Sequence, residues 1–492
     1  MRIKFRHALI VIAAMAIGLP GCTKDNNGGD NVGGEDTVSG YFSVAVSTPK
    51  TSETRTEGGS SITDVDTEDA KIKNVTLILT DNDGKVQQFF TNIAVTSGTT
   101  SPVKVAIGTY DIYTIVNLSG NIASILRQGV DIDDLIQTAT ANEIKNYADA
   151  SSKGFMMLNA NNNIDKTTNS AWQNITIETA NTQNNPKTIS INVDRLVAAI
   201  RTDLSDIPGI KPGSSLENAK EEESSASLIT SLRMDGLYPL NILNKYNPIQ
   251  TWIANPDVNS DKSKILSTPT PLQSATADIA SNFYNRPTQI SSFDVTSKYV
   301  TSTFLTNADF SELKYVLENR PVIVPDGLNL TTYDNIATGV IFKVSALNAS
   351  TIAETFYRVR ATDKCYYDKA VAITALNTAT GSNIPTTETD LALLRAAGLQ
   401  VYEDGAMYFT YYIKDQNYKA SYTSPAITDA FYHAIHRNSV YDLTVTSISN
   451  LGADLPGGDI TNPDGPDIIA DTYLLVTIIV NQWVGNDIRI EL

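Results

Sequence analysis

The most β-prone stretch of the chain is residues 470–492, where large apolar side chains recur at every second position. Alternation with a period of two is typical of a β-strand that buries one face. The residues sharing this face are Leu474, Val476, Ile478 and Val480. The preceding residues 451–467 are rich in Gly and Pro, which predicts an irregular tether. The pattern therefore predicts a C-terminal strand that pairs either with its own chain or with a neighbour. Trp483 follows it, and its size makes it a candidate anchor in a partner's pocket.

Short strands of the same kind recur along the chain, separated by turn-forming residues. They are expected at residues 41–48, 74–80, 87–90, 102–106, 110–118, 155–158, 174–178, 189–204, 228–234, 339–346, 355–360, 406–414 and 440–449. In the first of them, Phe42, Val44 and Val46 share one face. Helices are expected over residues 121–150, with a break near Gly129, and over 311–319 and 389–397.

These spacings predict a mainly β protein with two antiparallel β-sandwiches in tandem and a few short helices. Residues 205–226 contain two Pro-Gly pairs and an acidic run, which favours a domain boundary there. Residues 238–297 are rich in Asn, Pro and Ser, and predict long loops with short strands.

The first residues have the pattern of an export signal. A basic start is followed by an apolar run at residues 8–18 that is too short to span a bilayer, and then by Leu19-Pro-Gly-Cys22. This resembles a bacterial lipobox, in which residues 1–21 are removed and Cys22 carries lipid. The alternative is an ordinary secretory signal with an unrelated cysteine. The polar, Gly-rich residues 23–39 predict a flexible spacer.

A second polar stretch, residues 49–70, contains a single arginine, Arg55. An exposed loop is the preferred place for proteolysis, so an arginine-specific protease is expected to cut between Arg55 and Thr56. The alternative is a solvated loop arginine without a role.

Composition argues against several classes of function. The formal net charge of −17 and the pI of about 4.6 disfavour binding to nucleic acid or anionic lipid through bulk electrostatics. Beyond Cys22 the only cysteine is Cys365, so no internal disulfide is expected. His433 and His436 lack further ligands at metal-binding spacing, and Asp81-Asn-Asp-Gly84 lacks the later ligands of a calcium loop and predicts a hairpin turn.

No nucleophile elbow or phosphate-binding loop is present in the sequence, so no enzymatic activity, cofactor or metal is expected. A pair of carboxylates for glycoside hydrolysis stays open, because acidic residues are plentiful and their separation cannot be read from sequence. The many tyrosines fit strands better than a glycan-binding surface.

Several stretches, taken in order, resemble the Bacteroidia-type fimbrillin family, the FimA-like shaft subunits of type V pili. They include the lipobox at Cys22, the strand before Arg55, and residues 69–79, 193–200, 436–443, 480–484 and 490–492. The resemblance implies two transthyretin-like sandwich domains, over residues 56–205 and 206–469. It also implies a lipidated propeptide, residues 22–55, whose strand with Phe42, Val44 and Val46 is removable, and a donor strand at residues 470–492.

The resemblance further implies a function. The precursor would reach the outer membrane as a lipoprotein, an arginine-specific protease would cut after Arg55, and the donor strand of an identical subunit would replace the strand that leaves. Identical subunits would then form an extracellular fimbrium for adhesion and virulence, with tip and anchor subunits as further partners. A tip or anchor subunit is one alternative, and a surface glycan-binding lipoprotein is another.

Overall fold

The computed structural model describes residues 38–47, 72–118, 126–132, 155–159, 172–202, 209–217, 219–243, 252–254, 264–266, 283–284, 314–319, 337–413, 433–456 and 474–482. All of them belong to one compact unit, Val38–Leu492, while Met1–Thr37 forms a separate unit that lies outside the described residues. Within the described residues, no helix is both long and apolar enough to cross a membrane.

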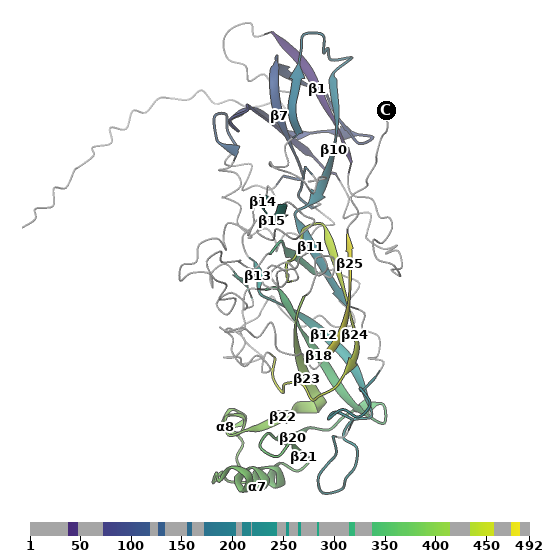
Figure 1. The fold of residues 1–492 in the computed structure, drawn as a ribbon, viewed down its shortest axis with the longest axis vertical. Helices are drawn as coiled ribbons and strands as arrows, with labels where there is room; N and C mark the ends of the chain where they lie inside the picture. The colour runs from purple at the N-terminus through teal and green to yellow at the C-terminus, as the bar shows by residue number, and fades with distance from the viewer. Residues whose placement is uncertain are drawn as a thin grey trace, which may run out of the picture. The chain divides into compact units, whose positions relative to one another are not determined.

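The N-terminal part of the unit is a ten-stranded sheet (Figure 1). Its strands are β1 (Ser39–Ser47), β2 (Val75–Thr80), β3 (Val86–Ile93), β4 (Val95–Thr96), β5 (Thr99–Thr100), β6 (Val103–Ala106), β7 (Gly108–Val116), β8 (Met157–Asn159), β9 (Trp172–Ile177) and β10 (Lys187–Arg195). The order along the sheet is β3-β2-β7-β8-β10-β1-β5-β4, with β6 paired to β1 and β9 to β7. The apolar faces of these strands meet in one buried cluster.

The hairpin turn predicted at Asp81–Gly84 is confirmed between β2 and β3. The Gly84 amide donates to the Asp81 carbonyl at 3.0 Å, and Gly84 has φ 77, a left-handed conformation that glycine adopts readily. The Asp81 carboxylate accepts from the amides of Asp83 and Lys85 at 3.0 and 2.9 Å. The aspartate oxygen therefore closes the turn itself.

The single strand expected over residues 189–204 is two strands, because the chain changes sheet at Leu196. β10 ends in the N-terminal sheet, and β11 (Val197–Thr202) joins a four-stranded sheet with β17 (Lys314–Leu317), β24 (Ser439–Ile448) and β25 (Leu474–Gln482). Leu196 itself is buried in the core of the N-terminal sheet. Because apolar side chains continue on both sides of the bend, the sequence pattern shows no break there.

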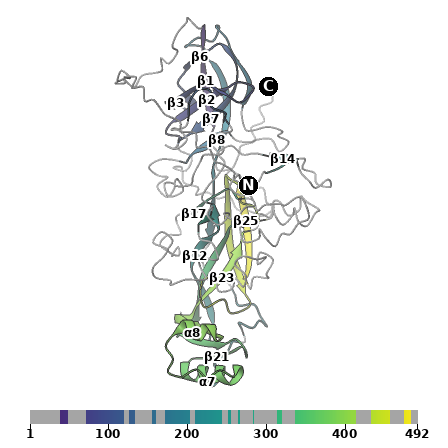
Figure 2. The ribbon, with the colours of Figure 1, turned by 90° about the vertical axis from the view of Figure 1, so that its left-hand side faces the viewer.

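A second four-stranded sheet contains β12 (Ser231–Leu240), β18 (Gly339–Asn348), β19 (Thr351–Ile352) and β23 (Ala406–Tyr412). Its buried side chains form one cluster with those of β11 and β24. Figure 2 shows the ribbons of β12 and β23 in the same part of the molecule as β17 and β25. β12 runs to Leu240, so the loop expected to begin at Tyr238 starts later. The short strands expected farther on are β13 (Ile242–Leu243), β14 (Trp252–Ala254), β15 (Lys264–Leu266) and β16 (Phe283–Tyr284).

The helix expected at residues 311–319 is wrong over its described part, which contains β17. Val316 and Leu317 are both 1% exposed, and antiparallel pairing with β11 overrides the local helical pattern. The helix expected at 389–397 is confirmed as α8 (Leu391–Ala396), with an Asp390 N-cap. The helix expected at 121–150 lies largely outside the described residues, and 126–132 form a turn with a bridge from Asp131 to Lys85.

Between β19 and β23 the chain forms a small lobe with a core of its own. A sheet of β20 (Phe356–Val359), β21 (Lys364–Tyr366) and β22 (Leu399–Tyr402) carries α8 and α7 (Lys369–Thr380), and the turn η6 (Glu403–Gly405) leads to β23. α7 is not among the helices expected from the sequence. Its boundary signals were present: Asp368 caps its first turn and Gly381, with φ 73, ends it.

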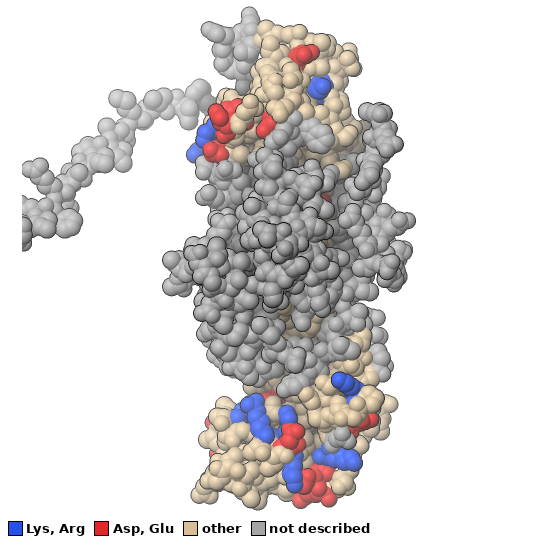
Figure 3. Space-filling view, viewed as in Figure 1, with Lys and Arg blue, Asp and Glu red and all other residues tan. Residues whose placement is uncertain are grey.

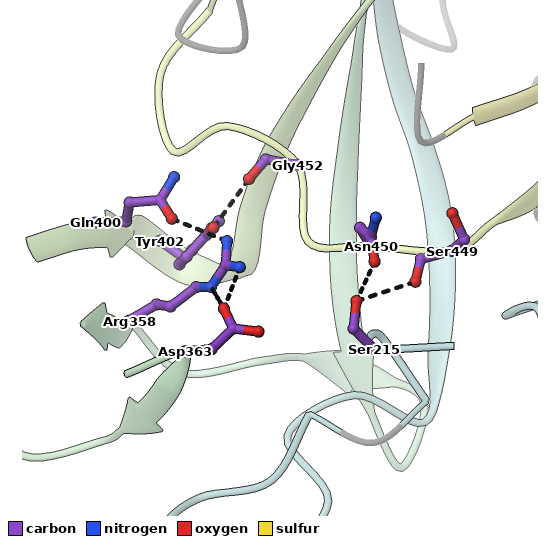
Figure 4. A network of polar contacts seen from close by, with 8 residues as sticks. All are labelled: Ser215, Arg358, Asp363, Gln400, Tyr402, Ser449, Asn450 and Gly452. Carbon is purple, nitrogen blue, oxygen red and sulfur yellow. Dashed lines mark hydrogen bonds and ion pairs between the residues drawn. The ribbon is translucent and has the colours of Figure 1, made fainter. Parts of the chain in front are cut away.

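Polar contacts join the lobe to the segment that follows β24 (Figure 4). The Tyr402 hydroxyl donates to the Gly452 carbonyl at 2.9 Å, and the Asp454 carboxylate accepts from Arg395 at 2.6 Å and from the Val401 amide at 2.8 Å. Ala453 is also buried. The first residues of the expected tether are therefore packed, and residues 457–473 lie outside the described part of the chain.

Charged side chains are mixed in sign over the described surface drawn in Figure 3, both on the N-terminal sheet and on the lobe. Ion pairs account for part of this, including Lys85 with Asp131 and Lys364 with Glu222. The acidic net charge is thus not gathered into one patch on that face.

Candidate functional site

β1 lies inside its sheet and has partners on both edges. It pairs in parallel with β10 from Phe42 opposite Lys187 to Ser47 opposite Asn192. On its other edge it pairs antiparallel with β6 over residues 39–42 and with β5 at Ala45. Because β8 pairs with β10 only over residues 193–195, residues 187–192 of β10 have β1 as their ladder partner. Removal of β1 would leave a slot with backbone edges on both sides.

The apolar face of β1 fills the core of the sheet. Phe42 and Val44 are fully buried and Val46 is 6% exposed, as the alternation in the sequence predicts. The backbone is held as well: the Val44 amide donates to the Thr100 hydroxyl at 2.9 Å, and the Val46 amide donates to the Gly98 carbonyl at 2.7 Å. The strand is thus an integral part of the sheet.

β25 is an edge strand that contains four of the residues predicted to donate: Leu474, Val476, Ile478 and Val480. It pairs antiparallel with β24, from Ser439 opposite Gln482 to Ile448 opposite Leu474, with one shift of register between Val445 and Ser447. In this monomer the strand therefore pairs with its own chain. β1 and β25 have the same length, nine residues each.

Four predicted positions have no described geometry. Cys22, Arg55, Thr56 and Trp483 lie outside the described residues. Their roles stay predictions from the sequence.

Two of the sequence motifs meet where β10 passes into β11. The motif at residues 193–200 and the motif at 436–443 lie side by side, because β11 and β24 pair in parallel from Ala199 opposite Val440. Arg195, which is 1% exposed, donates to the Asn438 side chain at 3.3 Å, and Asn438 donates to Asp194 at 2.8 Å. The Asn438 amide also donates to the Val197 carbonyl at 2.7 Å. This polar contact fixes the crossing between the two sheets.

A buried ion pair lies beside this crossing. Arg437 donates to the Glu318 carboxylate at 2.8 and 3.2 Å, and both side chains are 6% exposed. Neither residue is among the site residues expected from the sequence. A charged residue next to apolar strand positions was the available signal, but only the fold brings Glu318 to Arg437.

The other reactive side chains are also buried. His433 contacts the Ile413 carbonyl through Nδ1 at 3.1 Å, and the His436 amide donates to the Tyr441 hydroxyl at 2.9 Å. Burial raises the pKa of the Cys365 thiol to about 12, and this side chain is 3% exposed. Within the described ranges, no group of three His, Cys, Asp or Glu residues could hold a metal ion.

Comparison with known proteins gives one family match. Residues 400–488 match the family described as "Major fimbrial subunit protein type IV, Fimbrillin, C-terminal". This segment contains β22, β23, β24 and β25, and therefore includes the strand predicted to donate. No curated protein matches the chain by sequence.

Among solved structures, a fimbrilin (FimA) from Porphyromonas gingivalis is similar with a TM-score of 0.42 and 14% identity, over 90% of this chain and 97% of that one. The tip fimbrial protein Mfa3 from the same organism, with a C-terminal truncation, has a TM-score of 0.41 and 12% identity, over 90% of this chain and 100% of that one. Both TM-scores are below 0.5, so the assignment depends on the family match. That match shows residues 400–488 of this chain to be similar to the C-terminal part of a major fimbrial subunit.

Proposed function

We propose that this chain is a shaft subunit of a surface fimbrium that polymerises by exchange of β-strands between identical copies. β1 would leave after proteolysis, and β25 of the next copy would enter its slot. The observation that carries the proposal is the position of β1, an inner strand with hydrogen-bonded partners on both edges. Its covalent link to the other strands of its sheet is the connection formed by residues 48–71.

Arg55 lies in that connection, so a cut after Arg55 would separate β1 from the body. The strand would then be held by non-covalent contacts alone. Burial of a large apolar side chain contributes roughly 1.5–3 kcal/mol, so Phe42, Val44 and Val46 hold β1 with several kcal/mol in addition to its ladder bonds. An empty slot would expose this apolar surface and two unpaired strand edges, which favours entry of another strand.

β25 has the features of a suitable replacement. It has the same length as β1, it lies at the edge of its sheet, and its sequence places Leu474, Val476, Ile478 and Val480 on one face. Trp483 would add an anchor beyond the strand. Residues 457–473 could span up to roughly 55 Å when extended, enough to reach a neighbouring copy. Because donor and acceptor surfaces differ, the contact does not close on itself and yields a filament.

The remaining parts of the proposal follow from the sequence. Residues 1–21 would direct export, Cys22 would carry the lipid that holds the precursor at the outer membrane, and cleavage at Arg55-Thr56 would release residues 22–55. The body would form two transthyretin-like sandwich domains, 56–205 and 206–469. Tip and anchor subunits would complete an extracellular fimbrium that supports adhesion.

Treatment with an arginine-specific protease tests this function. The full-length chain should lose every residue up to Arg55, including the propeptide 22–55, and form filaments visible by electron microscopy. A variant without residues 470–492 should be cut at the same rate and stay monomeric. Filaments formed by that variant would overturn the proposed exchange, and substitution of Arg55 by Lys provides a control that should be neither cut nor polymerised by this protease.

A further inference from the structure

A turn next to β1 contacts the strand at a point where a replacement strand could not make the same contact. This turn, Glu178–Asn181, directly follows β9. The Tyr41 amide of β1 donates to the Asn181 carbonyl at 2.8 Å. The turn is closed by its own bonds, because the Asn181 amide donates to the Glu178 carbonyl at 3.0 Å and the Glu178 amide donates to the Asn181 side chain at 2.8 Å. The contact surface offered to β1 is therefore well fixed.

Gly40 packs directly against this turn. A Cβ atom at residue 40 would lie 2.5 Å from the Glu178 carbonyl oxygen and 2.8 Å from Cγ2 of Ile177. Both distances are shorter than real Cβ contacts. The oxygen belongs to the backbone and is engaged by Asn181, and Ile177 is 1% exposed, so neither atom has room to move away. The turn thus admits glycine at this position and no residue with a side chain.

β25 contains no glycine. Its sequence, Leu-Leu-Val-Thr-Ile-Ile-Val-Asn-Gln, fills residues 474–482 without one. The nearest glycine beyond it is Gly485. In an unbroken strand Gly485 lies on the face opposite to Leu474, Val476, Ile478 and Val480, because successive residues point to opposite faces. A β25 strand that buries these four side chains cannot place glycine against the turn.

We propose that the Glu178–Asn181 turn acts as a selective lock for β1. It accommodates only glycine at position 40, and so favours the precursor's own strand over β25 in the slot. The inference rests on the proposed strand exchange and adds the residues that set its timing. β25 would occupy the slot only from the position of Phe42 onward and would lose the bond to the Asn181 carbonyl. The lock would hold uncut subunits as monomers, and it would have no strand left to hold once residues 22–55, which contain Gly40, are removed.

The experiment uses the full-length, uncut chain and a fluorescent peptide with the sequence of residues 38–48 as the strand probe. Incorporation of the probe reports how often β1 leaves the slot. Gly40→Val should raise the rate of incorporation at least tenfold over the wild type, and Gly40→Ala should raise it by a smaller factor. The matched control is Ala45→Val, which adds the same kind of bulk on the opposite face of β1 and should leave the rate unchanged.

Equal rates for the wild type and both Gly40 variants would overturn the lock. If Gly40→Val does not fold, the Gly40→Ala variant decides, since it adds a single carbon atom. Hydrogen–deuterium exchange in β24, which does not pair with β1, verifies that the body of each variant is intact.

The same variants separate this inference from the proposed function. After cleavage at Arg55 all of them yield an identical chain, so the rate of filament growth from cut subunits should not differ between them. If cut wild-type chains form no filaments, the proposed function fails, while the dependence of probe incorporation on Gly40 still decides whether the turn selects β1.

Discussion

At the scale of single residues, the ion pair between Arg437 and Glu318 combines a large desolvation cost with close charge-assisted hydrogen bonds. Such a pair adds little net stability over an apolar one, but removal of one partner leaves a buried charge without compensation. It lies at the crossing of the two sheets, next to the contact of Arg195 with Asn438. Loss of one partner of this ion pair should therefore lower the stability of the whole unit.

Substitution Arg437→Met should lower the free energy of unfolding by about 3–5 kcal/mol, because Glu318 then stays buried without its partner. Unfolding by urea, followed by circular dichroism, measures the change. The control is Lys85→Met, which breaks the half-exposed pair with Asp131 and should cost at most about 1 kcal/mol. Equal effects of the two substitutions would contradict the account of the crossing.

Cys365 provides a second test at this scale. Its thiol has a pKa of about 12 because burial disfavours the thiolate, so iodoacetamide should not label it in the folded protein at pH 8. Labelling should appear in denaturant and can be assigned by peptide mass spectrometry. The raised pKa also predicts a pH dependence. The stability contributed by burial of the neutral thiol is fully present below pH 9, the ordinary value, and is lost as pH rises toward 12. Rapid labelling at pH 8 under native conditions would exclude this burial.

At the scale of elements, the alternating pattern predicts most of the described strands, because burial on one face needs no knowledge of the partner. β1 is the clearest case, with Phe42, Val44 and Val46 all in the core. Pairing over long range decides the exceptions. Residues 314–317 form a strand because β11 lies beside them, and the bend at Leu196 separates two strands that read as one.

The candidate site, too, is predictable from the sequence only in part. The sequence identifies which residues of β1 face inward, but the parallel partner β10 and the contact of Gly40 with the Glu178–Asn181 turn require the fold. A glycine at the start of a predicted strand can mark a bulge, a bend or a close approach of another backbone segment. Only the position of the Glu178 carbonyl identifies a close approach at Gly40.

Substitution Phe42→Ala belongs to this scale. It should lower the free energy that holds the precursor's N-terminal sheet by about 3–5 kcal/mol, because it leaves a cavity in a fully buried site. Urea unfolding of the uncut chain measures this. The cut chain no longer contains residue 42, so its stability and filament growth should equal those of the wild type. An effect that persists after cleavage would show that β1 does not leave.

At the scale of the whole molecule, the proposed exchange would make the monomer with β25 paired to β24 a storage form. Exchange requires β25 to leave this edge and enter a neighbour, so the free energy of filament growth is the difference between the free energies of the two strand pairings.

Substitution Ile478→Asp should stop elongation, because it places a charge in the filled slot. Electron microscopy of cut chains provides the measurement, and Thr477→Asp on the opposite face is the control that should still elongate.

In the proposed exchange, one slot is emptied of β1 and refilled by β25 of another copy. Hydrogen–deuterium exchange of residues 187–192, whose ladder partner is β1, tests it most directly. We predict slow exchange in the uncut chain, fast exchange in the cut chain lacking residues 470–492, and slow exchange again in filaments of the cut full-length subunit. Slow exchange in the cut chain without residues 470–492, or fast exchange in the filaments, would contradict the account.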